Sequence, residues 1–467
     1  MNQPCITIIM GIGLVFLVAG AVGGEEISTS TTFLSLDGGG WVVAADPDNT
    51  GRDAAWWTAP RPEAQPLRVP GILQEALPGY HGVAWYWREF TPPANPYESG
   101  RCLLRFHAVD YLAEVWLNDT PVGGHEGGET PFTFDITEVL LPSQTNRLAV
   151  RVLNPTDTPI DGIVLKQTPH RNKGAAGIVV GGSYNSGGIV EPVEVFWTPA
   201  VRIEDVYVRP DWKTGLVRVQ TTVINAGPDP VEGQFQLNIA PALESPSVAS
   251  LAFIRDLPPG SNVLESELKI ENHRLWQLDD PYLYRLSARV APTPLAGYPN
   301  TQTHEYFTRF GFRDFRVEKG YFRLNGKRIF VKSSHTGNHC PVGAILPPDS
   351  AKDLLRKDLL YAKSLGFNMI RFIAGMAHPY QLDVCDEIGL MVYEENLAGW
   401  CLEDSPAMAA RFDFSLREMV LRDRNHPSLT IFGLMNEVGN GPVVQHAIAS
   451  LGMLRSLDDT RLILLQS

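Results

Sequence analysis

The residue best placed for chemistry in this chain is a glutamate that follows a buried apolar run. Asn436 and Glu437 come directly after residues 429–434, which are almost wholly apolar and fit a strand buried on both faces of a parallel sheet. Asn425-His426-Pro427 stops any helix before this run, because the residue before a proline avoids the helical region. A carboxylate at the carboxyl end of such a strand lies where (β/α) barrels carry their catalytic groups. The alternative is an Asn-Glu pair that ends a strand in solvent, as surface glutamates usually do.

Other polar side chains stand at or just beyond further predicted strand ends, which in a barrel converge on one face. The candidates for substrate binding are His335, His339, Arg371, Glu394 and Asn436. Glu395 directly follows Glu394 at the same strand end. For Arg371 a structural ion pair is an equally good interpretation, because a buried charge requires a partner. The two histidines lie in a glycine-containing loop, where a structural role is the alternative, and His378 is assigned a structural role.

The elements that must position these residues begin after Phe310, where the sequence pattern changes. Asn325-Gly326 predicts a hairpin with a type I′ turn. Short apolar strands then alternate with helices, and Ser350 and Gly366 are placed to cap and to end the first helix. Strands are predicted at 329–331, 368–373, 390–394, 429–434 and 462–465, and helices at 351–365, 381–387, 407–422 and 443–456. Four strand–helix units and a fifth strand form the first part of a (β/α)8 TIM barrel over residues 311–467.

Two β-rich regions precede the predicted barrel. In residues 32–199, Leu104, Phe106 and Ala108 fall on one face of a strand, and such alternation with Gly and Pro punctuation predicts a jelly roll or sandwich. Residues 201–310 alternate in the same way, as at Val217 and Val219, and predict an immunoglobulin-like β-sandwich. The many Trp and Tyr side chains of the first region could bind sugar, and the alternative is that they pack within the sheets.

Composition narrows the classes of function. A chain of 467 residues predicts several domains, and 44% hydrophobic with 19% charged residues is ordinary for a globular protein. The net charge of −13 disfavours a nucleic-acid partner, which requires a basic surface. The five cysteines include no Cys-x-x-Cys pair, so a structural zinc site is not expected. Isolated buried thiols are preferred to disulfides.

The amino terminus predicts export. Residues 1–23 carry no charged side chain, and Ala19-Gly20-Ala21 supplies the small residues that a signal peptidase reads. The apolar run 6–22 is short for a membrane span, which needs about 20 apolar residues. We therefore expect a secreted or periplasmic protein with a signal peptide over residues 1–23 and no stable membrane insertion after cleavage.

The stretch Arg422–Glu437 resembles a motif of glycoside hydrolase family 2, which includes β-galactosidases, β-glucuronidases and β-mannosidases. The motif is Arg-Asp-Arg-Asn-His-Pro, a buried strand and then Asn-Glu. The resemblance continues in residues 82–90, 113–118, 125–132, 366–371 and 385–389. It implies a jelly-roll sugar-binding domain, an immunoglobulin-like domain and a TIM-barrel catalytic domain in that order. One departure is Ala374, which stands where the galactosidases and glucuronidases have a histidine.

The chemistry that the resemblance implies is retaining exo-β-glycoside hydrolysis. We predict no cofactor and assign no metal ligand in the sequence. Glu437 would be the general acid and base, and Asn436 would bind the sugar 2-hydroxyl. A second carboxylate, about 5 to 5.5 Å from the first, attacks the anomeric carbon. Burial and this neighbour must raise the pKa of the acid. The family places that nucleophile near the end of barrel strand seven, beyond Ser467, where this chain ends at strand five.

Two hypotheses follow for the function of the chain. The first is a family 2 exo-β-glycosidase that acts on a carbohydrate, with the 467-residue chain inactive because its nucleophile is absent. The second is a non-catalytic carbohydrate-binding protein with a decayed barrel. The intact Asn436-Glu437 pair favours the first, and the missing strands favour the second. An oligomer is possible, and the sequence leaves the sugar and its linkage open.

Overall fold

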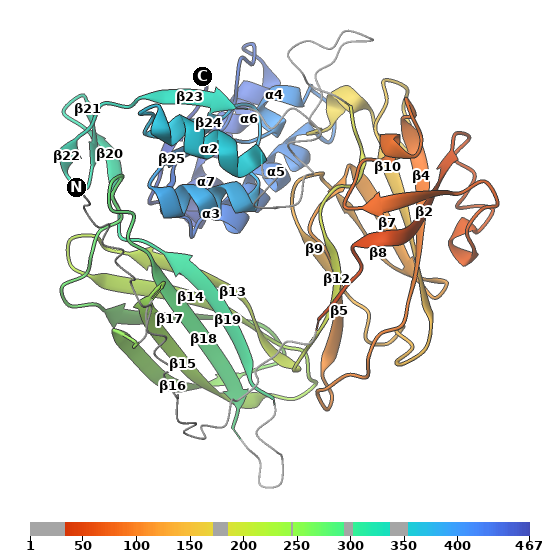
Figure 1. The fold of residues 1–467 in the computed structure, drawn as a ribbon, viewed down its shortest axis with the longest axis horizontal. Coiled ribbons are helices and arrows are strands. Elements are labelled where there is room, and N and C mark those ends of the chain that lie inside the picture. The colour runs from red at the N-terminus through yellow and green to blue at the C-terminus, as the bar shows by residue number, and fades with distance from the viewer. Residues whose placement is uncertain (1–32, 171–184, 244–245, 294–301, 337–353) are drawn as a thin grey trace, which may run out of the picture. The chain divides into compact units, whose positions relative to one another are not determined.

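The computed structural model describes residues 33–170, 185–243, 246–293, 302–336 and 354–467 (Figure 1). All described residues belong to one compact unit of the chain, residues 31–467. The predicted signal peptide, His339 and the predicted cap Ser350 lie outside the described residues. Among the described residues, no helix combines the length and apolar character that a membrane span requires.

The first β-rich region forms two facing sheets. One has the strand order β1-β12-β5-β9 and the other β3-β2-β4-β10-β7-β8, while β6 and β11 form a short separate pair. Trp41 and Tyr86 from the second sheet and Leu104 and Trp197 from the first share one buried core, because successive strand residues point to opposite faces. The strands are β1 (Phe33–Ser35), β2 (Gly38–Asp46), β3 (Gln65–Val69), β4 (Gly82–Phe90), β5 (Arg101–Phe106), β6 (Val109–Asp110), β7 (Leu112–Leu117), β8 (Thr120–Glu126), β9 (Phe132–Asp135), β10 (Asn146–Asn154), β11 (Gly188–Ile189) and β12 (Val193–Thr198), with short 3-10 helices at Trp56–Thr58, Leu73–Glu75 and Leu165–Gln167.

Most of the tryptophans of this region pack in the protein. Trp85 and Trp87 are fully buried, and the Trp57 and Trp116 rings stack with centroids 5.4 Å apart. These rings form a second apolar cluster that is separate from the core between the two sheets. The alternative interpretation of the aromatic residues, sheet packing, therefore accounts for these four.

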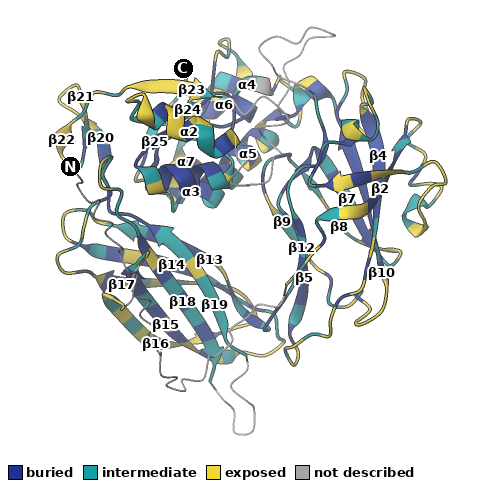
Figure 2. Cartoon of the chain, in the orientation of Figure 1, coloured by how far each residue is buried: buried dark blue, intermediate teal, exposed yellow. Residues whose placement is uncertain are grey.

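The second β-rich region is a sandwich of two antiparallel sheets, with orders β13-β14-β17 and β16-β15-β18-β19. Val217, Val219 and Leu237 alternate with exposed or half-buried polar residues and meet in a common core. The strands are β13 (Val201–Pro210), β14 (Leu216–Asn225), β15 (Val231–Pro241), β16 (Ala249–Leu257), β17 (Gly260–Lys269), β18 (Tyr284–Pro292) and β19 (His304–Phe310). The dark core stripes of both sandwiches are visible in Figure 2.

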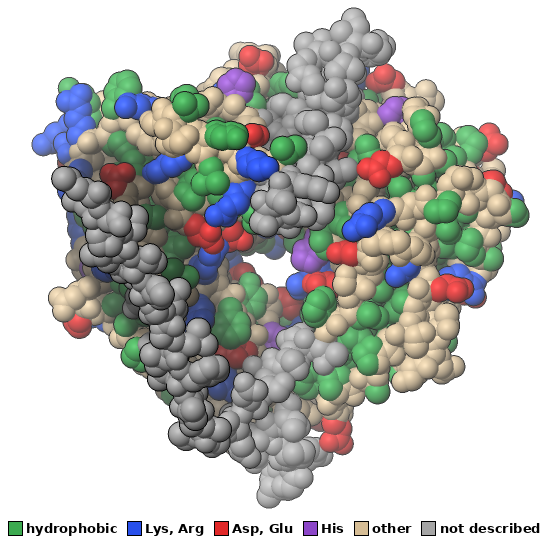
Figure 3. Space-filling view, viewed as in Figure 1, with side chains coloured by type: hydrophobic (Ala, Val, Ile, Leu, Met, Phe, Trp, Pro, Cys, Tyr) green, Lys and Arg blue, Asp and Glu red, His purple; other side chains and the backbone are tan. Residues whose placement is uncertain are grey.

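The predicted hairpin leads into the barrel. It consists of β20 (Phe315–Glu318), β21 (Tyr321–Leu324) and β22 (Lys327–Arg328). Asn325 and Gly326 have φ of 52° and 76°, and a type I′ turn requires positive φ at both central residues. The turn chemistry predicted from this dipeptide is therefore confirmed. Basic side chains gather on this hairpin, whereas elsewhere on the visible face acidic and basic groups are interspersed (Figure 3).

Five parallel strands with helices between them follow the hairpin. The sheet order is β23-β24-β25-β26-β27, so that β23 and β27 are edges and the described barrel is not closed. Its elements are β23 (Ser333–Thr336), α2 (Leu354–Ser364), β24 (Met369–Phe372), α3 (Pro379–Ile388), β25 (Met391–Glu395), α4 (Ala398–Cys401), α5 (Met408–Asp423), β26 (Leu429–Gly433), α6 (Pro442–Ala449), α7 (Leu451–Leu457) and β27 (Leu462–Leu464).

Two predicted elements of the barrel differ from the structure. The first strand is β23 and not residues 329–331, because Ile329 and Val331 pack against an apolar cluster that includes Trp276. The helix predicted at 443–456 is two helices, α6 and α7, which meet at Ser450. The Ser450 hydroxyl bonds to a carboxylate oxygen and to a backbone carbonyl, a competition that bends helices.

The two faces of the barrel sheet differ in their partners. Met369, Met391 and Ile431 lie in one cluster with Trp276, whereas Ile370 lies in a cluster with the helices. Alternation along each strand thus assigns every second residue to the interior of the sheet. This alternation decides which polar residues can meet at the carboxyl ends of the strands.

Candidate active site

Arg371 organises the polar residues at the carboxyl ends of the barrel strands. It lies on β24, and its guanidinium group donates to Oε1 of Glu395 from Nε at 2.7 Å. Its Nη2 is 2.6 Å from the same oxygen and 2.6 Å from Oδ1 of Asn436. Nη2 also donates to the Ser467 hydroxyl at 2.5 Å. Three strand ends are therefore joined through one side chain.

The partners of Arg371 are withdrawn from solvent. Glu395 is fully buried and Asn436 is 4% exposed. Oε2 of Glu395 accepts the backbone N–H of Ala374 at 2.7 Å, and Oε1 accepts the Ser467 hydroxyl at 3.1 Å. Both carboxylate oxygens are thereby satisfied, which a buried charge requires. The two alternatives for Arg371 are compatible, because the ion pair holds its cation beside Asn436.

The residue next to Glu395 occupies a different environment. Glu394 is fully buried, and its Oε2 accepts the Ala377 N–H at 3.4 Å, while Oε1 has no hydrogen-bond partner among the described residues. Burial and the nearby Asp423 raise the pKa of Glu394 well above its usual range. The sequence predicted that Glu394 would lie with Arg371. In the structure Glu395 lies there instead, and Glu394 does not. Consecutive strand residues face opposite sides, so only one of the pair can point inward.

Glu437 follows β26 in an unusual backbone conformation. Its φ is 51°, a left-handed conformation that is uncommon for residues other than glycine, and its N–H donates to the Ser467 carbonyl at 3.1 Å. Asn436 before it is buried, whereas Glu437 itself is exposed. The described residues thus leave the Glu437 side chain open to solvent. Strained backbone at the carboxyl end of a barrel strand nevertheless supports a functional hypothesis for this position.

The histidines fall into three situations. His335 lies on β23, paired in register with Arg371, and is exposed. The position of His339 stays a prediction, because this residue lies outside the described range. His378 caps α3 by accepting from the Tyr380 N–H, and its Nε2 lies 3.0 Å from Glu191 of the first β-rich region. Its contacts agree with the structural role predicted for it.

The first β-rich region packs directly against the barrel helices. Glu126 accepts from Nε of Arg411 on α5 at 2.5 Å and from the Tyr111 hydroxyl at 2.6 Å. Arg422, near the end of α5, donates to the Glu129 carbonyl at 3.0 Å. These contacts hold residues 125–130, a stretch with the sequence His-Glu-Gly-Gly-Glu-Thr, on the barrel.

The described residues contain one cluster of three possible metal ligands, Asp383, Asp386 and His426. Its ligand atoms lie within 4.8 Å of one another, but Nδ1 of His426 already bonds to Asp386 at 2.6 Å. Arg309 neutralises Asp383 at 2.5 Å. His426 precedes β26, at the amino end of the strand, whereas Glu437 follows its carboxyl end. The cluster is therefore separate from the Arg371 site, and cations already compensate its charges.

Three consecutive family models match the chain. They are "Glycosyl hydrolases family 2, sugar binding domain" over residues 33–199, "Glycosyl hydrolases family 2" over 201–313 and "Glycosyl hydrolases family 2, TIM barrel domain" over 315–467. With the five-stranded open sheet, these matches confirm the predicted fold class of jelly roll, immunoglobulin-like sandwich and incomplete barrel.

Curated relatives and solved structures agree with this architecture. A β-glucuronidase from Paenibacillus borealis is 27% identical over 428 residues, 85% of this chain and 66% of the relative. A β-galactosidase from Yersinia pestis is 26% identical over 428 residues, 83% of this chain and 38% of the relative. A β-glucuronidase from Ruminococcus gnavus in complex with D-glucuronic acid superposes with a TM-score of 0.76 at 22% identity, covering 95% of this chain and 73% of that one. The chain thus spans less than two thirds of the length of each of these two curated relatives.

Proposed function

Because the chain belongs to glycoside hydrolase family 2, we propose that it carries the acid/base half of a retaining exo-β-glycosidase site. The observation that carries this proposal is the buried Arg371–Glu395–Asn436 cluster next to Glu437 at the end of β26. A substrate sugar would lie against Asn436, whose amide bonds the 2-hydroxyl. Glu437 would protonate the departing oxygen and later remove a proton from water.

Arg371 serves this site by orientation. Its Nη2 donates to Oδ1 of Asn436 at 2.6 Å, which leaves the Asn436 amide N–H groups free to face a sugar hydroxyl. The same guanidinium group balances the charge of Glu395. Arg371 is therefore proposed as a positioning residue, and His335 on the neighbouring strand as a residue at the rim of the sugar site.

The 467-residue polypeptide alone is proposed not to turn over glycosides. Retaining hydrolysis needs a second carboxylate about 5 to 5.5 Å from the acid. Of the described residues at this site, Glu395 is the interior carboxylate, and Arg371 and Ala374 already occupy its oxygens. Glu437 is also exposed, so the described residues do not enclose its carboxyl group.

The test is hydrolysis of a panel of aryl β-glycosides, including the galactoside and the glucuronide. It is applied to the 467-residue polypeptide and to a version extended to the length of the curated relatives. We expect turnover only in the extended version. Turnover by the shorter polypeptide that Glu437→Gln abolishes would refute the proposed inactivity. Absence of turnover in a folded extended version would refute the glycosidase proposal.

The second candidate function is carbohydrate binding without catalysis. It is favoured by the exposure of Glu437 and by the match of residues 33–199 to a sugar-binding domain. Titration with sugar lactones, monitored by tryptophan fluorescence, separates the two candidates. Binding that Asn436→Ala removes, with no turnover in the extended version, would establish the second.

Export is also proposed, with cleavage close to Ala21. The uncharged apolar segment and the small residues before the cleavage position support it. Amino-terminal sequencing of the mature protein is the test. An intact Met1 on a cytoplasmic product would contradict it.

A further inference from the structure

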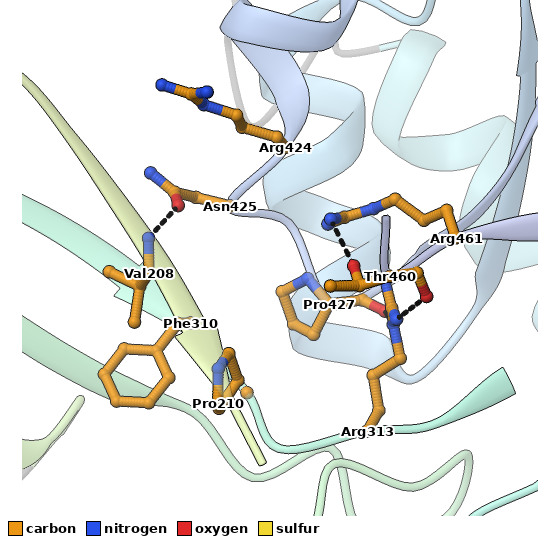
Figure 4. Close-up of a pocket in the computed structure, with 10 residues that line it drawn as sticks. Val208, Pro210, Phe310, Arg313, Arg424, Asn425, Pro427, Thr460 and Arg461 are labelled. Carbon is orange, nitrogen blue, oxygen red and sulfur yellow. Dashed lines mark hydrogen bonds between the residues drawn. The ribbon is translucent and has the colours of Figure 1, made fainter. Parts of the chain in front are cut away.

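A small cavity lies between the immunoglobulin-like sandwich and the amino ends of the barrel strands (Figure 4). Its volume is about 30 Å³. The sandwich contributes an apolar wall, and the barrel contributes residues that directly precede β26 and β27. The lining residues are Val208, Pro210, Phe310, Gly311, Arg313, Arg424, Asn425, Pro427, Thr460 and Arg461.

Three of the lining residues are buried arginines, and their exposures are at most 8%. In Figure 4, Arg313 lies below and Arg461 on the right, whereas the guanidinium group of Arg424 points to the upper left, away from them. Arg461 is paired with Asp458 at 2.5 Å, and Arg424 is paired with Asp205 at 2.6 Å. Two of the three cations therefore have a carboxylate of their own.

Arg313 is the exception. Its three hydrogen bonds end on backbone carbonyl oxygens, those of Pro427 at 3.1 Å, Thr460 at 3.2 Å and Leu429 at 2.8 Å. Among the described residues, no carboxylate forms an ion pair with it. Arg313 therefore has no ion pair of its own among these residues, and the charges of Asp458 and Asp314 act on it only from a greater distance.

The surroundings of Arg313 make this charge costly. Burial, together with the nearby Arg461, lowers the pKa of Arg313 to about 9, so the guanidinium group still carries its charge at neutral pH. A buried charge is stabilised only by a counter-charge and by complete hydrogen bonding. Carbonyl oxygens supply hydrogen bonds but no full negative charge.

The cavity therefore combines free volume with a buried cation that has no ion pair among the described residues.

The size of the cavity restricts the ligand. One water needs about 10 to 15 Å³ of such volume, so about 30 Å³ accommodates one ion slightly larger than water. The apolar wall of Val208, Pro210 and Phe310 suits a weakly hydrated ion. We propose that this cavity binds a single monovalent anion of the size of chloride, which neutralises Arg313 and locks the sandwich onto the barrel.

The test measures the stability of the 467-residue protein against chloride at constant ionic strength, with gluconate as the replacing anion. We expect the urea midpoint to rise with chloride and to saturate, because a ligand that binds only the folded state stabilises it by mass action. Bromide should act in the same way. A crystal soaked in bromide should show an anomalous peak inside the cavity.

Variants assign the effect to this cavity. Arg313→Met should remove the chloride dependence, whereas Arg218→Met, at an exposed arginine in an ion pair with Glu267, should retain it. If Arg313→Met fails to fold, Val208→Ile is the second variant, because it fills the cavity with a methyl group and keeps every charge. In Val208→Ile, the chloride concentration that gives half of the rise in the urea midpoint should be at least tenfold higher than in the native protein.

Three results would overturn the proposal. One is an equal response of the native protein to chloride and gluconate, which would mean general screening. Another is a cavity that holds water only after the bromide soak. The last is a chloride response that survives in Val208→Ile or in Arg313→Met.

Discussion

The ion pair between Arg371 and Glu395 leads to the sharpest prediction about the barrel. Glu395 is fully buried, and Arg371 is the cation that compensates it. Arg371→Met keeps the apolar stem of the side chain and removes the charge. Breaking a buried pair in this way typically costs about 3–5 kcal/mol. We expect about 3 kcal/mol, at the lower end, because Glu395 retains the hydrogen bonds from Ala374 and Ser467.

The assay is urea unfolding followed by circular dichroism at 222 nm. The α-helices of the described residues all lie in the barrel, between Leu354 and Leu457, so this signal reports on the unit that contains the pair. With a slope of about 1–3 kcal/mol per molar urea, a loss of about 3 kcal/mol lowers the midpoint by about 1–3 M.

The matched control is Arg218→Met. Arg218 pairs with Glu267 at 3.1 Å, but the two side chains are 55% and 60% exposed. Exposed pairs contribute about 0–1 kcal/mol, so the control should lower stability little. Adding Glu395→Gln to Arg371→Met should recover part of the loss, because the buried charge disappears. An equal loss in Arg371→Met and in the control would refute the interpretation of this pair.

Three further predictions concern the barrel. Burial opposes the charge of His426, but Asp386 raises the pKa of this histidine above its usual value. The interaction therefore stabilises the fold below about pH 6.5, and this stabilisation is lost as the pH rises through the folded-state pKa. The urea midpoints at pH 6 and pH 9 should differ less in His426→Gln than in the native protein. Burial raises the pKa of Glu394, so the native protein should lose stability as the pH rises from 4.5, whereas Glu394→Gln should show a flatter pH profile of the urea midpoint. Gly389→Ala should lower the midpoint more than Gly366→Ala, since both have positive φ but only at Gly389 would a methyl group lie 2.2 Å from a carbonyl oxygen.

The local features of the fold could be predicted from the sequence because they depend on near neighbours. The strand 429–434 is β26, Leu429–Gly433, since its apolar run is bounded by Pro427 and by glycines. The Asn325-Gly326 turn has the predicted conformation, because few other residues tolerate positive φ at two successive positions. The open five-stranded sheet likewise follows from counting apolar strands.

The side chains of the site could be predicted only in part, because their contacts depend on strand phase and on distant segments. Glu394 and Glu395 show this. If the register of β25 moved by one residue, Glu394 would face the barrel interior and Glu395 would face the helices. The phase is set by the pairing of β24 with β25, which places Arg371 opposite Tyr393 and is known only from the structure. The hydrogen bonds of Ser467 to Arg371 and Glu395 had no sequence signal at all.

Glu437 is proposed as the acid and base of a glycosidase site. The decisive measurement is the kinetics of Glu437→Ala in the version extended to the length of the curated relatives. We expect a loss of about 10²–10⁴-fold for substrates with poor leaving groups and a smaller loss for activated aryl glycosides, which need less protonation. Azide should restore the second step by replacing the water that Glu437 activates, and it should give a glycosyl azide of retained configuration. Unchanged hydrolysis of poor substrates by Glu437→Ala, or no effect of azide, would contradict the account.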